Sequence, residues 1–192
     1  MAEIAPKDTK GNPPVIFVTG GSRGSQTINE NLLPILTKLL KLFRVIHQTG
    51  PLDYSKFTTF REHLTKTEQD NYEVYDRVDP MQIDNLYRET DMVISRGGAN
   101  TVDEIMCVKR PSIIIPIPWT YLNEQMNNAV YAKKYGIAEI IEQKNINPEL
   151  LYRTIMRIND DWNKIVKNVK NKVSPDKLAA KKLVDILEEF IR

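Results

Sequence analysis

Short apolar segments alternate with longer amphipathic segments along most of this 192-residue chain. The longer segments place apolar residues at helical spacing, whereas the short ones have the length of strands. Strands that alternate with helices form a parallel sheet with helices on both faces. We therefore predict an α/β fold with a doubly wound, Rossmann-like parallel sheet. The predicted strands are residues 15–19, 43–47, 72–75, 92–95, 112–117 and 138–141.

The predicted helices lie between these strands and after the last of them. Residues 1–13 are polar and rich in proline and glycine, which is typical of a leader or linker. Because domains usually contain about 100 to 200 residues, we expect residues 14–192 to form a single domain ending in helices. The last helix, 177–191, is expected to pack on that domain. The predicted helices are residues 27–42, 54–67, 81–89, 101–108, 124–135 and 148–192, with a break near residue 174.

Composition limits the partners and the compartment. The 27 basic and 25 acidic residues are scattered in both signs, so we exclude nucleic acid as a partner. The single cysteine, Cys107, cannot form an internal disulfide, which fits a reducing compartment, and we expect it to be buried and inert. No segment has the apolar core of a signal peptide or the ~20 apolar residues of a membrane span. The expected location is cytoplasmic, at most peripheral on a membrane.

A glycine-rich turn at residues 20–25 follows the first predicted strand and precedes a helix. In open α/β sheets, phosphate-bearing ligands bind at such junctions. The turn is similar to that of short-chain dehydrogenases, but their next glycine would fall at Gln26. Those enzymes also need a tyrosine followed four residues later by lysine, which none of the eight tyrosines here has. A nicotinamide-dependent oxidoreductase is therefore disfavoured.

A second glycine turn, SRGGANTVDEI at residues 95–105, again joins a strand to a helix. Gly97 and Gly98 permit a tight turn of amides, Asn100 or Thr101 can cap the helix, and two such turns at one sheet edge suit a diphosphate. Glu104, one turn into the helix, can accept hydrogen bonds from the vicinal hydroxyls of a ribose. The simpler alternative is that its carboxylate only stabilises the helix N-terminus.

A third polar turn, residues 118–129, contains Glu124 and Gln125, side chains that can pair with adjacent sugar hydroxyls. The structural alternative is a helix N-terminus capped by Asn123.

The segment SRGGANTVDEI resembles the signature of the MurG family of glycosyltransferases: Ser or Cys, Arg, a small residue, Gly, Ala, any residue, Thr, then Glu three residues on. The resemblance covers about residues 15–150, including the HQTG and RV segments at 47–50 and 77–78. It implies the C-terminal, donor-binding half of a GT-B enzyme. Uracil would contact Val78, and the diphosphate would contact the two glycine turns. The ribose would contact Glu104, and N-acetylglucosamine would contact Glu124 and Gln125. The implied donor-binding residues are Gly20, Gly21, Ser22, Val78, Gly98, Ala99, Asn100, Thr101, Glu104, Glu124 and Gln125.

Two departures from the family pattern bear on these assignments. An insertion of about two residues around 79–81 affects the uracil contact, and Asn100 replaces an apolar residue of some relatives. In the family a first domain carries a glycine-rich turn with a histidine for the lipid-linked acceptor. Neither His47 nor His63 resembles that motif, so we expect the general base in a missing acceptor domain and leave the catalytic residues unassigned.

The resemblance implies the donor half of an inverting transferase that moves N-acetylglucosamine from UDP-N-acetylglucosamine to a lipid-linked acceptor, the peptidoglycan precursor lipid I if MurG-like. Without the acceptor domain the chain is expected to be inactive. No Asp-x-Asp pair occurs, so neither a metal nor another cofactor is implied. The alternatives are an excised domain, a subunit of a split enzyme, a UDP-sugar epimerase, or a non-catalytic UDP-sugar-binding module. Basic residues in 148–172 would suit an anionic membrane or a solvated face.

Overall fold

The structure, a computed structural model, describes residues 4–173 and 179–191. Its centre is a six-stranded parallel sheet with the strand order β3-β2-β1-β4-β5-β6. The predicted α/β class and doubly wound sheet are therefore confirmed. The strands are β1 (Val15–Thr19), β2 (Arg44–Gln48), β3 (Tyr72–Tyr75), β4 (Met92–Ser95), β5 (Ser112–Ile114) and β6 (Ala138–Ile140).

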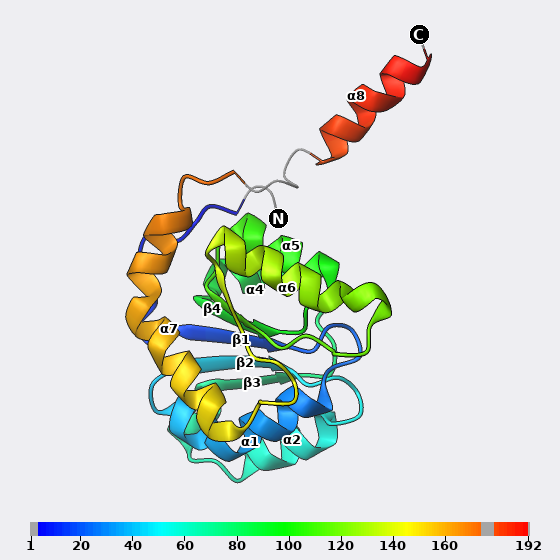
Figure 1. Ribbon diagram of the computed structural model, residues 1–192. Coiled ribbons are helices and arrows are strands. Elements are labelled where there is room, and N and C mark those ends of the chain that lie inside the picture. Colours follow the sequence, from blue (N-terminus) through cyan, green and yellow to red (C-terminus); the bar gives the residue numbers. More distant parts are fainter. Residues whose placement is uncertain (1–3, 174–178, 192) are drawn as a thin grey trace.

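Helices cover both faces of the sheet (Figure 1). One face is covered by α1 (Gln26–Leu40) and α2 (Tyr54–Glu62). The opposite face is covered by α4 (Ile83–Glu89), α5 (Ala99–Val108) and α6 (Glu124–Tyr135). Alternate residues of β1 enter two separate cores, since Ile16 packs in the α1 cluster and Phe17 in the α4–α6 cluster. The remaining helices are α3 (Lys66–Asp70), the short 3₁₀ helix η1 (Tyr121–Asn123), α7 (Pro148–Val169) and α8 (Ala179–Ile191).

The predicted segment 54–67 forms part of two helices rather than one. The capping box of Thr65 and Glu68 starts α3, whose first turn therefore begins anew after α2 has ended. The predicted strand 112–117 pairs only as far as Ile114. The proline at 116 has no amide to donate to β6, and the amide of Ile117 donates to Gln125 Oε1 instead of to the segment after β4. No described helix is long and apolar enough to cross a membrane.

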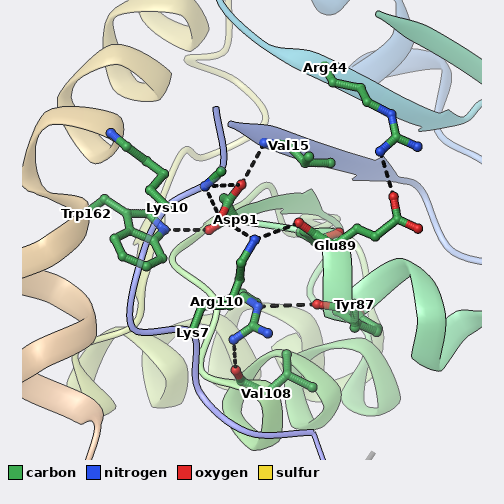
Figure 2. Close-up of polar contacts among 12 residues, drawn as sticks. Lys7, Lys10, Val15, Arg44, Tyr87, Glu89, Asp91, Val108, Arg110 and Trp162 are labelled. Carbon is green, nitrogen blue, oxygen red and sulfur yellow. Dashed lines mark hydrogen bonds and ion pairs between the residues drawn. The ribbon is translucent and has the colours of Figure 1, made fainter. Parts of the chain in front are cut away.

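Residues 4–13 contain no helix or strand, yet they lie against the domain through the buried carboxylate of Asp91 (Figure 2). Asp91 accepts hydrogen bonds from the amides of Gly11 (3.2 Å) and Val15 (2.8 Å), and Lys7 Nζ lies 2.6 Å from it. The backbone oxygen of Asp91 also accepts from Trp162 Nε1 of α7 at 2.8 Å. This carboxylate therefore fastens the first described residues to the start of β1.

The last helix differs from its prediction. The apolar side chains of α8 are exposed, with Leu183 at 59% and Phe190 at 85%, and the helix lies apart from the sheet and its covering helices (Figure 1). The expected packing of this helix on the domain is therefore wrong for the described residues. The predicted break near residue 174 and the first two residues of the predicted helix 177–191 lie outside the described residues.

Candidate functional site

The strand order changes direction between β1 and β4: β2 and β3 are added on one side of β1, and β4, β5 and β6 on the other. β1 and β4 are parallel, hydrogen-bonded neighbours, with Thr19 opposite Ser95. In open α/β sheets, ligands bind beyond the carboxyl ends of the strands at such a switch point. A pocket of about 330 Å³ opens there, within the usual range of ligand sites. Its lining residues are Phe17, Thr19, Gly21, Ser22, Gln48, Val78, Pro80, Ile83, Tyr87, Asn100, Thr101 and Glu104.

The structure brings six of the predicted site residues to this pocket: Gly21, Ser22, Val78, Asn100, Thr101 and Glu104. Gly20, Gly98, Ala99, Glu124 and Gln125 do not line it. The polar wall comes from the turns after β1 and β4, and the apolar wall comes from β1 and the segment between β3 and α4. The insertion around 79–81 contributes directly, because Pro80 lies in the apolar wall beside Val78 and Ile83.

The first glycine turn is held by the two side chains that end β1 and β2. Thr19 Oγ1 accepts from the Gly21 amide (3.1 Å) and donates to Gln48 Oε1 (3.1 Å), and Gln48 Nε2 donates to the Gly21 oxygen (3.2 Å). Gly21 has φ +78°, and a Cβ there would meet no atom within 4 Å. The turn thus offers a tightly positioned, unobstructed main chain to the pocket.

The other glycines of this turn serve packing. A Cβ on Gly24 would lie 2.0 Å from the Thr49 oxygen, so the turn packs backbone to backbone against the loop after β2. A Cβ on Gly20 would lie 2.2 Å from the Gly24 carbonyl carbon. Ser25 then caps α1 by accepting from the amide of Ile28 at 3.3 Å. Gly20 therefore allows the turn to pack tightly on itself and does not line the pocket.

The N-terminus of α5 opens beside the first turn. Gly98 occupies the N-cap position, and no side chain caps the helix. The expectation that Asn100 or Thr101 caps it is wrong, because both lie inside the first turn, whose first helical hydrogen bond runs from Val102 to Gly98 at 3.0 Å. The first-turn amides and the positive end of the helix dipole favour a bound anion.

Glu104 lies one turn further along α5 and lines the same pocket. Its Oε2 accepts a hydrogen bond from the Tyr87 hydroxyl at 3.1 Å. Burial raises the pKa of Glu104, the carboxylates of Asp103 and Asp84 raise it further, and the Tyr87 hydrogen bond lowers it. The pocket therefore holds a carboxylate with one oxygen engaged by a tyrosine.

Gln125 joins two loops through its side-chain oxygen, which accepts from the amides of Gly97 (3.2 Å) and Ile117 (3.1 Å). Asn128 of the same helix donates to the Gly97 oxygen at 3.0 Å. Glu124 is exposed at the start of α6. Asn123 stands at the N-cap position with φ +55°, and its side chain makes no capping hydrogen bond.

Neither histidine lies in the pocket. His47 of β2 is buried, with Nδ1 2.9 Å from the Tyr72 hydroxyl and Nε2 2.9 Å from Asn29 Oδ1. Because an amide oxygen only accepts, we assign the proton to Nε2. Burial lowers the pKa of His47 to about 3, so its ring is neutral and structural. His63 is exposed, with Nδ1 2.8 Å from the Thr59 oxygen.

Two further residues differ from or extend the sequence analysis. Cys107 is half-buried rather than buried, with its sulfur 3.9 Å from Asp103 Oδ1. Arg96 of the second glycine turn is buried; its Nη1 donates to the Ile115 oxygen (3.0 Å) and to Gln143 Oε1 (2.7 Å). Arg96 thus ties the end of β5 to the loop after β6.

Sequence reasoning missed three polar residues of the pocket: Thr19, Gln48 and Tyr87. Thr19 and Gln48 carried a signal, since polar residues that end adjacent buried strands point to the sheet edge where ligands bind. Tyr87 carried none, because a tyrosine among the apolar positions of a helix reads as a core residue.

A protein family described as glycosyltransferase family 28 C-terminal domain matches residues 15–185. The chain is 37% identical over 150 residues to a UDP-N-acetylglucosamine--N-acetylmuramyl-(pentapeptide) pyrophosphoryl-undecaprenol N-acetylglucosamine transferase of Prochlorococcus marinus (strain AS9601), covering 78% of this chain and 39% of the relative. The protein of the same name from Finegoldia magna is 30% identical over 189 residues, covering 96% of this chain and 49% of the relative. The chain thus spans about half or less of these relatives.

Among solved structures, the crystal structure of Acinetobacter baumannii MurG superposes with a TM-score of 0.74 at 24% identity, covering 98% of this chain and 52% of that one. A Staphylococcus aureus MnaA–UDP structure superposes with a TM-score of 0.67 at 14% identity, covering 96% and 47%. Both likenesses concern the fold.

Proposed function

The chain belongs to the glycosyltransferase family 28 C-terminal domains, within the MurG-like N-acetylglucosaminyl transferases of GT-B fold, and we propose that it binds the UDP-N-acetylglucosamine donor of such a transfer. One observation carries this proposal. The uncapped N-terminus of α5 and the carboxylate of Glu104, one turn apart on the same helix, face a single pocket at the switch point of the sheet. A diphosphate and a ribose are the groups that this pair suits.

Each part of the UDP group has a counterpart in the pocket or beside it. Uracil would lie against the apolar wall at Val78, ribose would donate to Glu104, and the diphosphate would face the first-turn amides of Ala99, Asn100 and Thr101. The Gly20-Gly21-Ser22 turn would contact the diphosphate on the side opposite α5. In this arrangement the donor would contact both turns of the polar wall as well as the apolar wall.

N-acetylglucosamine would extend toward the start of α6, past Gly98. The oxygen of Gln125 is already shared between two backbone amides. We therefore assign sugar recognition by Gln125 to its side-chain amide nitrogen, and assign a hydroxyl contact to the exposed carboxylate of Glu124.

The reaction we propose is an inverting transfer. A hydroxyl of a lipid-linked acceptor sugar attacks the anomeric carbon, a new glycosidic bond forms as the bond to the diphosphate breaks, and UDP leaves with the electron pair. The helix dipole and amides of α5 would stabilise the charge that develops on the leaving phosphate. The acceptor proton would pass to a general base on an acceptor-binding domain or partner subunit, because both histidines here lie outside the pocket. Without that part the chain would bind donor but not turn over.

A lipid-linked acceptor would require the catalytic complex to meet a membrane surface. We propose a peripheral association on the cytoplasmic face, supplied by the complex as a whole. The basic side chains of α7, such as Arg153, are exposed and also form ion pairs, here with Glu149 at 3.7 Å.

Calorimetric titration with UDP-N-acetylglucosamine, UDP and NADPH tests the donor site. Both uridine ligands should bind to the wild type, and Glu104→Ala should weaken them by about tenfold or more, the equivalent of about 1.4 kcal/mol. Glu62→Ala, the same change at an exposed carboxylate of α2, is the matched control and should leave binding unchanged. Binding of NADPH alone would overturn the proposal.

An activity assay separates the enzyme from a non-catalytic module. UDP release should require the separately expressed N-terminal half of a full-length relative together with an acceptor lipid. Donor binding without UDP release in that reconstituted mixture would favour the non-catalytic alternative.

A further inference from the structure

Tyr87 reaches the pocket from the core of the domain. It belongs to α4 and is fully buried, and its hydroxyl ends 3.1 Å from Glu104 Oε2. Both residues line the same pocket, so the contact joins the core to the part of the site where ribose would lie.

The tyrosine ring is fixed in place by its surroundings. It packs edge to face on Phe17 of β1, with ring centroids 5.9 Å apart. The backbone oxygen of Tyr87 accepts from Nε of the buried Arg110 at 3.3 Å, as Figure 2 shows. Because the ring is held in place, the hydroxyl oxygen has a fixed position, from which it donates to Glu104.

The carboxylate of Glu104 needs this donor. Two acidic residues, Asp84 from α4 and Asp103 from its own helix, disfavour its ionised form, as burial does. The Tyr87 hydroxyl opposes them. A phenol that donates to Oε2 leaves Oε1 with its full capacity to accept.

We propose that Tyr87 is a positioning residue that holds Glu104 ionised and in a single orientation, so that the site selects ribonucleotides over 2′-deoxyribonucleotides. The inference rests on the proposed donor site and extends it to a residue that does not touch the sugar itself. A carboxylate with one oxygen tied to a buried phenol cannot turn to follow a ligand. A 2′-deoxyribose therefore loses a hydrogen bond to Glu104 that the fixed carboxylate does not replace.

Tyr87→Phe removes the hydroxyl and keeps the ring that packs on Phe17. The matched control is Tyr75→Phe, which removes a similar hydrogen bond, from Tyr75 to Glu73 Oε2 at 2.9 Å, outside the pocket. UDP and 2′-deoxy-UDP would be titrated calorimetrically into the wild type, both phenylalanine variants and Glu104→Ala. Circular dichroism would verify that each variant is folded.

We expect Tyr87→Phe to weaken the binding of UDP about tenfold, as loss of a hydrogen bond to a charged group does. The affinity for 2′-deoxy-UDP should change little. Tyr75→Phe should match the wild type. Failure of wild-type protein to bind UDP would sink the donor-site proposal itself. If UDP binds and Glu104→Ala weakens it, whereas Tyr87→Phe retains wild-type affinity and discrimination, only the present inference is overturned.

The pH dependence separates positioning from simple packing. Affinity for UDP-N-acetylglucosamine, measured from pH 4 to 8, should begin to fall at a higher pH in Tyr87→Phe than in the wild type. The reason is that Glu104 protonates more readily without its donor. Glu104→Gln should remove this dependence, and Tyr87→Phe should then have no pH effect of its own. Equal weakening of both nucleotides with an unchanged pH profile would overturn the proposal.

Discussion

Gly97, which follows β4, donates its amide hydrogen to the side-chain oxygen of Gln125 on α6 over 3.2 Å. The two backbones meet so closely that a Cβ on Gly97 would lie 2.3 Å from the Gln125 backbone oxygen. The same Gln125 side chain also receives the amide of Ile117. One amide side chain thus sets the distance between the second glycine turn and the loop that precedes α6, on which the proposed sugar contacts depend.

Gln125→Ala should lower the free energy of unfolding by about 1–3 kcal/mol, because two backbone amides lose their acceptor. Chemical denaturation measures this change. Gln125→Glu keeps an oxygen in the same place and is the matched control, with a smaller expected loss. An alanine variant as stable as the wild type would show that water replaces the side-chain oxygen.

Glycine substitutions should separate packing positions from open ones. Gly24→Ala would combine φ +74° with a Cβ 2.0 Å from the Thr49 oxygen and should unfold the domain or cost several times more than Gly21→Ala. Gly21→Ala, at φ +78° in open space, should cost about 1–2 kcal/mol. Gly98→Ala, with φ −65° and open space, should leave stability within about 0.5 kcal/mol. Thermal denaturation of the three variants orders them, and equal losses at Gly24 and Gly21 would contradict this account.

The carboxylate of Asp91 should be essential for holding residues 4–13 on the domain. Asp91→Ala leaves the amides of Gly11 and Val15 without an acceptor and removes the ion pair with Lys7, so we expect a loss of about 3–5 kcal/mol. Limited proteolysis should then cleave within residues 4–13 much faster. Asp8→Ala removes an exposed partner of Lys170 and should change stability by less than about 1 kcal/mol. Unchanged proteolysis in Asp91→Ala would contradict the role of this carboxylate.

Acid should destabilise the domain through His47. Its folded pKa of about 3 lies below the ordinary value of 6.5, so the unfolded state binds the proton first as pH falls. The contribution to stability is complete above pH 6.5 and is lost progressively toward pH 3, with a slope approaching about 1.4 kcal/mol per pH unit from this residue alone. Denaturation at several pH values, together with NMR titration of the His47 ring, measures both. A ring that titrates near pH 6.5 in the folded protein would refute the assignment.

The sequence by itself determined the order of the elements and much of their extent. The strands Val15–Thr19, Tyr72–Tyr75 and Met92–Ser95 and the helix Glu124–Tyr135 agree with their predicted bounds. Short apolar segments mark the strands, and Gly136, with its positive φ, ends the helix. The glycine turns were equally visible, since glycine marks where backbones must approach closely or adopt a positive φ.

Only the tertiary structure decided how these parts meet. Periodicity says that a face is buried but not against what, so the sequence could not order the strands. Pairing of β1 with β4 is what places the two glycine turns around one pocket. The Tyr87 hydroxyl reaches Glu104 across 17 positions of sequence, and Gln125 reaches Gly97 across 28. Such contacts follow from the packing of whole helices on the sheet, which local spacing does not encode.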